Sequence, residues 1–384
     1  SWLVHRMTGG RSASCNYFLD FAAWLGVGVR RIVSTRYLKV TLTLTQTISA
    51  ADAKPNWNRR LSAYAAADNG RAIFEICVTI LPFIALWAGM WGMLDVSYWL
   101  VILLAIPAAG LMVRLFIIQH DCGHGAMLTS RKANDWIGRL LGILTLTPYD
   151  YWRHTHALHH ASSGNLDRRG IGDIDTITVA EYRALGSFDR LKYRLYRHPL
   201  VMFGLGPAYL FILQHRLPVG AMHSGAVPWV STMLTNIGIA VIYGILIWAV
   251  GFKAFLMIQV PLVLMGASIG VWLFYVQHQF DPAHWDKAEE WNREEAALYG
   301  SSFYDLPKPL MWMTGNIGIH HVHHLASRIP FHQLPQILKD YPELRQIGRI
   351  SLRDSLGCIR LTLWDETCRK LVSFRDFYRM EQAA

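Results

Sequence analysis

Three short clusters of histidine hold the residues best suited to chemistry in this sequence. Within each cluster the histidines are three or four positions apart, so on a helix they share one face. Eight neutral imidazole nitrogens are too many for one metal ion and suit two. These histidines are His120 and His124, then His156, His159 and His160, and finally His320, His323 and His324.

The residue types alone leave the identity of the metal open. Imidazole is a borderline ligand that serves Fe, Zn, Cu or Ni. Cys122 lies inside the first cluster, and a thiolate ligand there remains an alternative, although the residue is off the face shared by His120 and His124. The sequence has five cysteines and no Cys-x-x-Cys pair, so no disulfide framework is expected.

The apolar content predicts a membrane protein. Of 384 residues, 52% are hydrophobic, and a membrane-spanning helix needs roughly 20 mostly apolar residues. The stretches that qualify are 72–94, 97–118, 230–250 and 254–276. Very short linkers join the first to the second and the third to the fourth, which predicts two hairpins that enter and leave on the same side. Glu75 and Arg114 lie near span ends, and Arg114 is expected to snorkel to the interface.

The distribution of positive charge predicts the orientation. Apart from Arg114 and Lys253, every Lys and Arg lies in residues 1–71, 119–228 or 277–384. The positive-inside rule therefore places these segments, and with them the histidine clusters, in the cytoplasm. The net charge of +10 is then an orientation signal with an attraction to anionic lipid. No nucleic-acid partner is expected, because the basic residues are dispersed and no binding motif accompanies them.

The chain outside the spans divides into three parts. Residues 1–56 are expected to be a poorly defined leader, 57–351 the main domain and 352–384 a cytoplasmic tail. Two apolar runs, 136–148 and 199–214, are too short to cross and predict interfacial helices. We therefore expect an all-α integral membrane protein with four spans, interfacial helices and a cytoplasmic histidine-cluster domain.

One polar segment, 164–175, has two interpretations. It contains Asp167, Arg168, Arg169, Asp173 and Asp175. Such a segment is often a solvated loop. It can instead cover the metal site or meet an electron donor, and the sequence does not separate these possibilities.

The three clusters and their flanks resemble the histidine boxes of membrane fatty acid desaturases. The segments are 120–124, 152–160 (Trp-Arg-His-Thr-His-Ala-Leu-His-His) and 318–324 (Gly-Ile-His-His-Val-His-His). The sequences of these segments are most similar to those of bacterial acyl-lipid desaturases of the omega-6, or Δ12, type, and the resemblance covers 57–351. It implies two non-haem Fe ions, O₂ as co-substrate, and an external ferredoxin or cytochrome b5 type electron donor. The implied reaction puts a cis double bond into a lipid-linked acyl chain, oleoyl to linoleoyl, at the bacterial inner membrane.

The resemblance also implies roles for individual residues. The eight box histidines map onto the metal ligands, and His278 matches a further ligand at the end of the fourth span. A plain boundary histidine is the alternative for His278. Asp121 and Asn316 are candidates to orient ligand histidines, against capping or solvation. No catalytic side chain beyond the metal ligands is expected.

Other functions share parts of this pattern. Carotenoid ketolases or hydroxylases and alkane hydroxylases also use histidine boxes, and ligands alone do not separate oxygen insertion from desaturation. A metal transporter is an alternative from a different class, but it predicts ligands in the middle of the spans, where this sequence has no Asp, His or Lys. The sequence has no His-Pro-Gly-Gly segment typical of cytochrome b5, so the electron donor is expected to be a separate protein.

Overall fold

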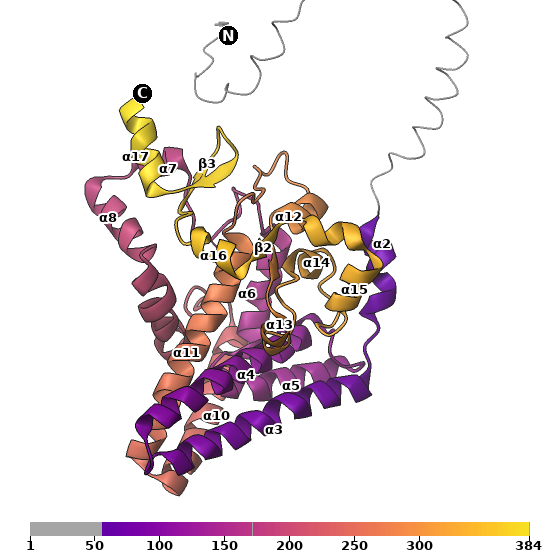
Figure 1. The fold of residues 1–384 in the computed structure, drawn as a ribbon, viewed down its shortest axis with the longest axis vertical. Helices are drawn as coiled ribbons and strands as arrows, with labels where there is room; N and C mark the ends of the chain where they lie inside the picture. The colour runs from indigo at the N-terminus through magenta and orange to yellow at the C-terminus, as the bar shows by residue number, and fades with distance from the viewer. Residues whose placement is uncertain (1–55, 171, 384) are drawn as a thin grey trace, which may run out of the picture. The chain divides into compact units, whose positions relative to one another are not determined.

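Four long apolar helices form the membrane part of the chain. They are α3 (Asn69–Met93), α4 (Tyr98–His124), α10 (Ala226–Val250) and α11 (Phe252–His278). The computed structural model describes residues 56–170 and 172–383, and in that part these four helices are long and apolar enough to cross a membrane. The turns at 94–97 and at 251 lie at the same end of the helices (Figure 1). The predicted four spans in two hairpins are confirmed, whereas the predicted leader falls outside the described residues but for Asn56.

The second and fourth spans carry histidines at their ends because the helices continue past the apolar residues. α4 runs six residues beyond the predicted end at Ile118 and includes His120 and His124. It ends at Gly125, which has a left-handed φ of 68°, the usual conformation of a helix C-terminus. α11 likewise ends at His278. Backbone hydrogen bonding does not depend on hydropathy, so polar residues extend a helix beyond its apolar stretch.

Arg114 does not snorkel to the interface as predicted. Its side chain is 1% exposed and pairs with Glu75 on α3, with 2.5 Å between Nη2 and Oε2. Its Nε donates to Thr79 at 3.1 Å. The guanidinium also lies 4.3 Å from the ring centroid of Trp312 on α13 (Lys308–Met313). Glu75 on the neighbouring helix and Trp312 on α13 thus keep the Arg114 charge inside the protein. The apolar pattern of the span does not reveal these contacts, because they come from other segments.

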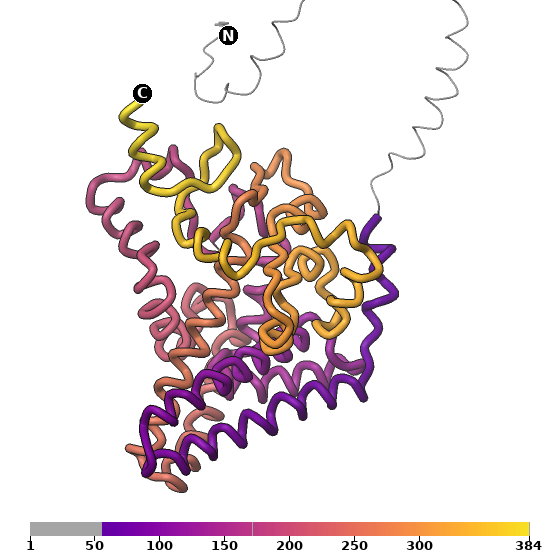
Figure 2. Tube along the Cα trace, viewed as in Figure 1, coloured from indigo at the N-terminus to yellow at the C-terminus, as the bar shows by residue number. Residues whose placement is uncertain are grey.

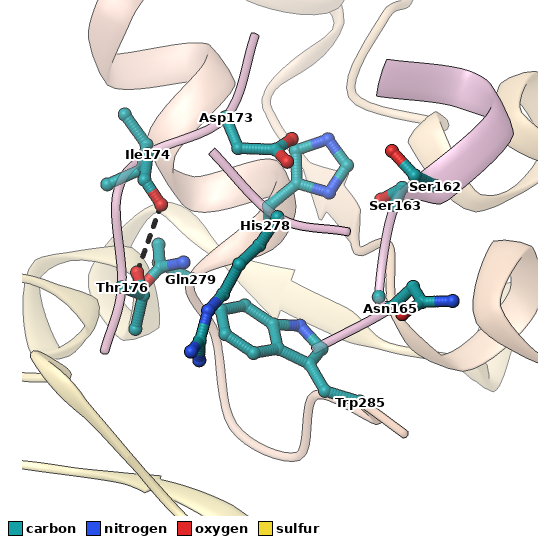
Figure 3. A pocket seen from close by; sticks show the side chains of 11 residues that line it. Ser162, Ser163, Asn165, Asp173, Ile174, Thr176, His278, Gln279 and Trp285 are labelled. Carbon is teal, nitrogen blue, oxygen red and sulfur yellow. Dashed lines mark hydrogen bonds between the residues drawn. The ribbon is translucent and has the colours of Figure 1, made fainter. Parts of the chain in front are cut away.

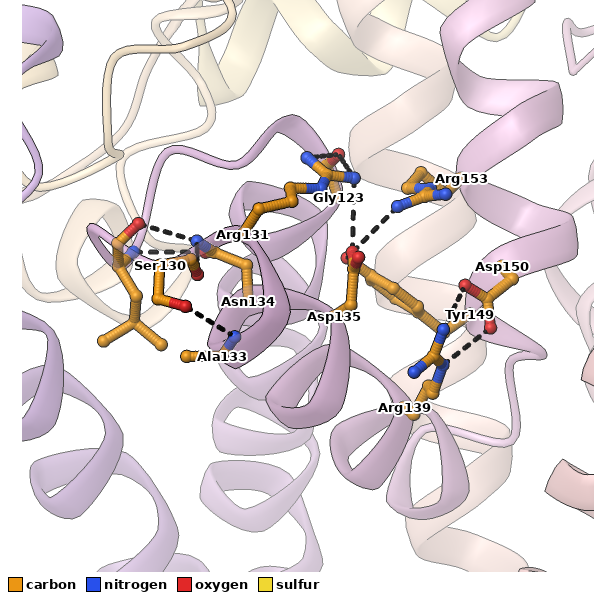
Figure 4. A network of polar contacts seen from close by, with 11 residues as sticks. Gly123, Ser130, Arg131, Ala133, Asn134, Asp135, Arg139, Tyr149, Asp150 and Arg153 are labelled. Atoms are coloured by element: carbon orange, nitrogen blue, oxygen red, sulfur yellow. Dashed lines mark hydrogen bonds and ion pairs between the residues drawn. The ribbon is translucent and has the colours of Figure 1, made fainter.

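A network of polar contacts fixes the helix that follows the first box (Figure 4). This helix, α5 (Arg131–Leu144), is the predicted interfacial helix, and it begins five residues earlier than predicted. Asp135 accepts hydrogen bonds from Arg153 (2.8 Å) and Tyr149 (3.0 Å), both on α6 (Tyr149–Ser162). Arg131 pairs with Asp135 at 3.2 Å and donates to the carbonyl oxygen of Gly123 at 3.3 Å. The network thereby sets the position of α6 relative to the end of α4.

The second predicted interfacial helix, 199–214, is irregular. Two π-helical turns, η2 (Val201–Leu205) and η3 (Tyr209–Leu213), flank the single α-turn α9 (Gly206–Ala208), and η4 (Gln214–Arg216) follows. Its inner face packs on α11, where Phe203 meets Trp272 edge-on with ring centroids 5.0 Å apart. Pro207 cannot donate to a regular helix, which accounts for the interruption beside Gly206.

The remaining elements are short. Residues 352–383 are folded and pack against the rest of the chain, as their yellow trace shows in Figure 2. Trp364 is 1% exposed and stacks on Trp285, with ring centroids 5.2 Å apart. β1 (Phe303–Asp305) pairs in parallel with β2 (Arg349–Ser351), and β3 (Leu363–Asp365) pairs antiparallel with β4 (Lys370–Val372). The short elements are α2 (Trp57–Leu61), η1 (Ser62–Ala65), α7 (Val179–Ala184), α8 (Ser187–Tyr196), α12 (Arg293–Tyr299), β1 (Phe303–Asp305), α14 (His320–Leu325), α15 (Leu334–Asp340), η5 (Pro342–Gln346), β2 (Arg349–Ser351), α16 (Leu352–Cys358), β3 (Leu363–Asp365), β4 (Lys370–Val372) and α17 (Phe374–Ala383).

Candidate metal centre

Nine histidines of the described chain converge into two groups, each with ring nitrogens within 4.8 Å of one another. They come from α4, α6, α11 and α14. The first group holds five, namely His120, His124, His156, His160 and His323, and the second holds four, namely His159, His278, His320 and His324. The structure thus brings together all eight box histidines and His278.

The distances between ring nitrogens in the five-histidine group favour a shared cation over hydrogen bonds. Nε2 of His156 lies 3.2 Å from Nε2 of His124 and 3.1 Å from Nε2 of His160. Nε2 of His160 is in turn 3.1 Å from Nε2 of His323. A ring nitrogen carries either one proton or one lone pair, so it cannot hydrogen-bond to two such neighbours. Metal–nitrogen bonds of about 2.1 Å that meet at a right angle put two nitrogens about 3.0 Å apart.

The four-histidine group has the same geometry. Nε2 of His278 lies 3.1 Å from Nε2 of His159 and 3.0 Å from Nε2 of His320. Nε2 of His324 is buried and has no hydrogen-bond partner among the described residues. A buried polar atom without a partner is costly, and a metal ion would satisfy it. The donor set of both groups therefore fits a metal ion.

The protonation of the box histidines also suits metal binding. Burial, and then the neighbouring imidazoles, hold the pKa of His156 and His160 well below the usual range. The same two causes lower the pKa of His320, His323 and His324. These rings are consequently neutral at pH 7, and the neutral ring is the form that binds metal ions.

Asp121 contacts a histidine of the five-histidine group. Its Oδ1 lies 3.0 Å from Nδ1 of His120, and its Oδ2 accepts the Phe331 backbone N–H at 2.6 Å. A proton on Nδ1 leaves Nε2 free to bind a metal. Asn316 donates its amide to the carbonyl oxygen of Phe331 at 3.4 Å, so it contacts the segment that holds Asp121 and not a ligand ring. A role for either residue in metal binding stays a prediction.

Asp173 is a functional candidate that the sequence did not single out. It lies in the ambiguous segment 164–175, and its Oδ1 forms a short contact with Nδ1 of His159. This segment lines a cavity of about 30 Å³ together with His278, Gln279 and Trp285 (Figure 3). The sequence signal for such a partner is an acidic residue shortly after the second box. Both Asp167 and Asp173 meet this description, and nothing in the sequence distinguishes them. Of the two interpretations, the contact favours a segment that covers the metal site.

Several residues near the boxes belong to neither group. The thiol of Cys122 is buried but is not part of either group. His321 donates from Nε2 to the carbonyl oxygen of Leu344 at 2.9 Å, and burial lowers its pKa to about 4. His154 is exposed on α6.

Aromatic rings line the centre. Trp152 stacks on His156, with centroids 4.7 Å apart and planes at 13°, and Phe116 packs edge-on against Trp152 at 5.2 Å. Phe274 lies 5.2 Å from the rings of both His159 and His278. Such rings keep water from a reactive metal site.

Arg197 connects the elements around the four-histidine group. It is 4% exposed, and its Nη1 donates to Thr176 at 2.9 Å. Its Nη2 donates to Gln279 (3.1 Å), the residue after His278, and to the carbonyl oxygen of Leu361 (2.7 Å). The guanidinium therefore joins the end of α11 to the segment that bears Asp173 and to the C-terminal part of the chain.

Replacing Arg197 with Met should destabilise this corner of the fold. The change removes the guanidinium donors from Thr176 and Gln279 and leaves between them only the 3.2 Å hydrogen bond from the Thr176 hydroxyl to the Gln279 amide oxygen. Loss of these buried hydrogen bonds costs about 1–3 kcal/mol in the free energy of unfolding. Thermal unfolding of purified protein in detergent measures the effect. Lys192→Met on α8, the helix that ends just before Arg197, is the control, because its pair with Asp189 is exposed. Equal melting temperatures for the two variants would contradict the connecting role.

The fold and the site define a class of protein: a multi-span membrane protein whose two groups of histidines could each hold a metal ion. The sequence model of the fatty acid desaturase family matches residues 97–350. A "Fatty acid desaturase" of Bacillus subtilis (strain 168) is 42% identical over 318 residues, which cover 83% of this chain and 90% of that protein. The chain therefore belongs to the fatty acid desaturase family and is an oxidoreductase, which confirms the resemblance of the histidine boxes.

The names of more distant relatives give different positions for the double bond. An "sn-1 acyl-lipid omega-3 desaturase (ferredoxin)" of Synechocystis sp. is 30% identical, over 57% of this chain and 61% of that protein. An "Omega-6 fatty acid desaturase, chloroplastic" of Glycine max is 25% identical, over 59% of this chain and 53% of that protein. These comparisons give no support to a ketolase, a hydroxylase or a transporter.

Proposed function

We propose that this desaturase holds two iron ions and converts oleoyl to linoleoyl chains in membrane lipid. The observation that carries the proposal is the convergence of nine imidazoles, in groups of five and four, at one end of four apolar helices. The omega-6 position rests on the amino-acid sequence of the histidine boxes, since the named relatives include both omega-3 and omega-6 enzymes.

Iron is the metal that suits both the ligands and the reaction. Desaturation follows R–CH₂–CH₂–R′ + O₂ + 2e⁻ + 2H⁺ → R–CH=CH–R′ + 2H₂O, so two electrons come from the acyl chain and two from a donor. Zinc has no redox chemistry, although imidazole also binds it. When bound, two irons would supply the redox steps that activate O₂.

The protein's own residues position the ions and exclude water. The nine histidines would hold the irons, and Asp121 keeps the Nε2 atom of His120 available for binding. Trp152, Phe116 and Phe274 form apolar walls beside the rings. An acyl chain is uniform along its length, so the choice of one carbon pair depends on how far the chain reaches past these walls.

The orientation and the electron donor follow from charge and from the relatives. The basic residues flank the spans on the histidine-box side, which favours the cytoplasmic face of a bacterial inner membrane. The printed names of relatives from Synechocystis and Nostoc include ferredoxin. We therefore propose that a separate ferredoxin or cytochrome b5 type protein delivers the electrons to this face.

A lipid profile tests the proposal. The full chain is expressed in a host rich in oleate that makes no dienes, and its fatty acids are analysed by mass spectrometry with localisation of double bonds. Linoleate should appear with the wild type and be absent with His159→Ala, because His159 is a proposed ligand of the four-histidine group. His223→Ala, an exposed histidine on a loop, should match the wild type. A diene with another double-bond position would refute the omega-6 assignment, and an oxygenated lipid would refute desaturation.

A further inference from the structure

The two histidine groups have one feature in common beyond their imidazoles. Each contains one histidine whose Nδ1 contacts a carboxylate: His120 with Asp121, and His159 with Asp173. The two carboxylates reach the centre by different routes. Asp121 follows His120 on α4, whereas Asp173 is 14 residues from His159 in sequence and comes from a loop.

The loop is shaped to bring Asp173 against α6. Gly172, the residue before it, has a left-handed φ of 70°, which side chains other than glycine rarely adopt. A Cβ at this position would lie 3.3 Å from the carbonyl oxygen of Thr155 and 3.5 Å from Cβ of His159. Glycine therefore permits both the turn and the close approach of the loop backbone to the helix that carries His159.

In the described part of the loop, hydrogen bonds of residues other than Asp173 hold it in place. The Leu166 N–H donates to the carbonyl oxygen of Asp286 at 2.8 Å, and the Asp286 N–H donates to that of Gly164 at 2.9 Å. Asp167 accepts the Ala288 N–H at 2.7 Å. The polar contact described for the Asp173 side chain is the one with His159. Its carboxylate thus serves the histidine and not the loop.

The geometry points to Asp173 as the positioning residue of the four-histidine group, and we propose that it controls how tightly this group holds its metal ion. The proposal rests on the proposed function, in which each group binds one ion. By accepting the Nδ1–H of His159, the carboxylate leaves Nε2 to face the metal and makes the ring a stronger donor. It also places a carboxylate beside a site whose four proposed ligands are all imidazoles.

The two carboxylates are not equivalent. Asp121 is 1% exposed and is held by the Phe331 N–H as well as by His120. The side chain of Asp173 is 17% exposed and borders the cavity of about 30 Å³. Substitution of Asp173 should therefore weaken one group and leave the other unchanged.

Metal affinity tests this role without any measurement of activity. Full-length wild type, Asp173→Asn and Asp173→Ala are loaded with iron, and in parallel with Co²⁺, and are titrated with a chelator while metal content and absorption spectra are recorded. Loss of a ligand-orienting partner typically lowers affinity by about 10–100-fold. We expect that loss for one of the two ions in Asp173→Ala. A smaller loss is expected in Asp173→Asn, whose amide oxygen still accepts the Nδ1–H.

Asp167→Asn is the matched control, because Asp167 anchors the same loop without contacting a histidine. It should retain both ions with wild-type affinity. The proposal is overturned if Asp173→Ala binds both ions as tightly as the wild type, or if Asp167→Asn weakens binding to the same extent. A wild type that takes up two Co²⁺ ions but no iron would refute the proposed iron centre, and the Co²⁺ titration would still decide the role of Asp173.

Discussion

We expect His278→Ala to abolish desaturation and to lower the iron content from the proposed two ions per chain toward one. His278 comes from the end of α11 and not from a histidine box, and its Nε2 lies within 3.1 Å of the Nε2 atoms of both His159 and His320. Its removal leaves three imidazoles in the four-histidine group, while the five-histidine group keeps its full set. Metal analysis of the purified protein and the diene content of expressing cells measure the two effects.

The controls for this variant separate a ligand from a buried support. His321→Ala removes a buried histidine that bonds to a backbone carbonyl; it should lower stability but leave two irons bound in the folded fraction. If His278→Ala retained two irons at wild-type affinity, His278 would be a boundary histidine, and its assignment as a metal ligand of the four-histidine group would be wrong.

Glu75→Gln should lower the free energy of unfolding by about 3–5 kcal/mol, the usual range when one partner of a buried ion pair is removed. The Arg114 guanidinium remains 1% exposed between α3 and α13 with no carboxylate to neutralise it. Thermal and denaturant unfolding in detergent measure the loss. Because α13 contacts Arg114 through Trp312, the variant should also weaken the packing of α13 against α4.

Two further variants check that the effect comes from an unpaired charge. Glu75→Gln combined with Arg114→Met should recover much of the lost stability, since the pair then leaves no buried charge. Asp189→Asn, which breaks an exposed pair with Lys192, should change stability by less than about 1 kcal/mol. A single Glu75→Gln variant as stable as Asp189→Asn would show that Arg114 reaches solvent after all.

The spans and the box histidines could be predicted from the sequence because their signals are local. Length and apolar content identify a spanning helix without reference to its neighbours, and all four predicted spans correspond to helices. Spacing likewise determines which histidines share a helix face. Each pair four residues apart stays together in one group: His120 with His124, His156 with His160, and His320 with His324.

The division of the remaining histidines between the groups depends on packing. His159 lies in the four-histidine group, whereas the other two histidines of its box lie in the five-histidine group. His323 lies in the five-histidine group, whereas the ligand pair of its box lies in the four-histidine group. Each of the two is three residues from a member of that pair. Three residues along a helix turn a side chain about 60° away from the starting direction, toward a different neighbour. Which neighbour it meets depends on how α6, α11 and α14 are placed, and spacing within one box carries no information on that.

Long-range contacts made the other differences between prediction and structure. Arg114 is buried because Glu75 faces it from another helix, and Asp173 meets His159 because Gly172 and the anchors at Asp286 bring a loop back onto α6. The sequence by itself determined the spans, the histidine faces and the family resemblance, since these are patterns within single segments. Only the tertiary structure decided which histidines form each group, and which carboxylate serves it, because those pairings join residues from separate segments.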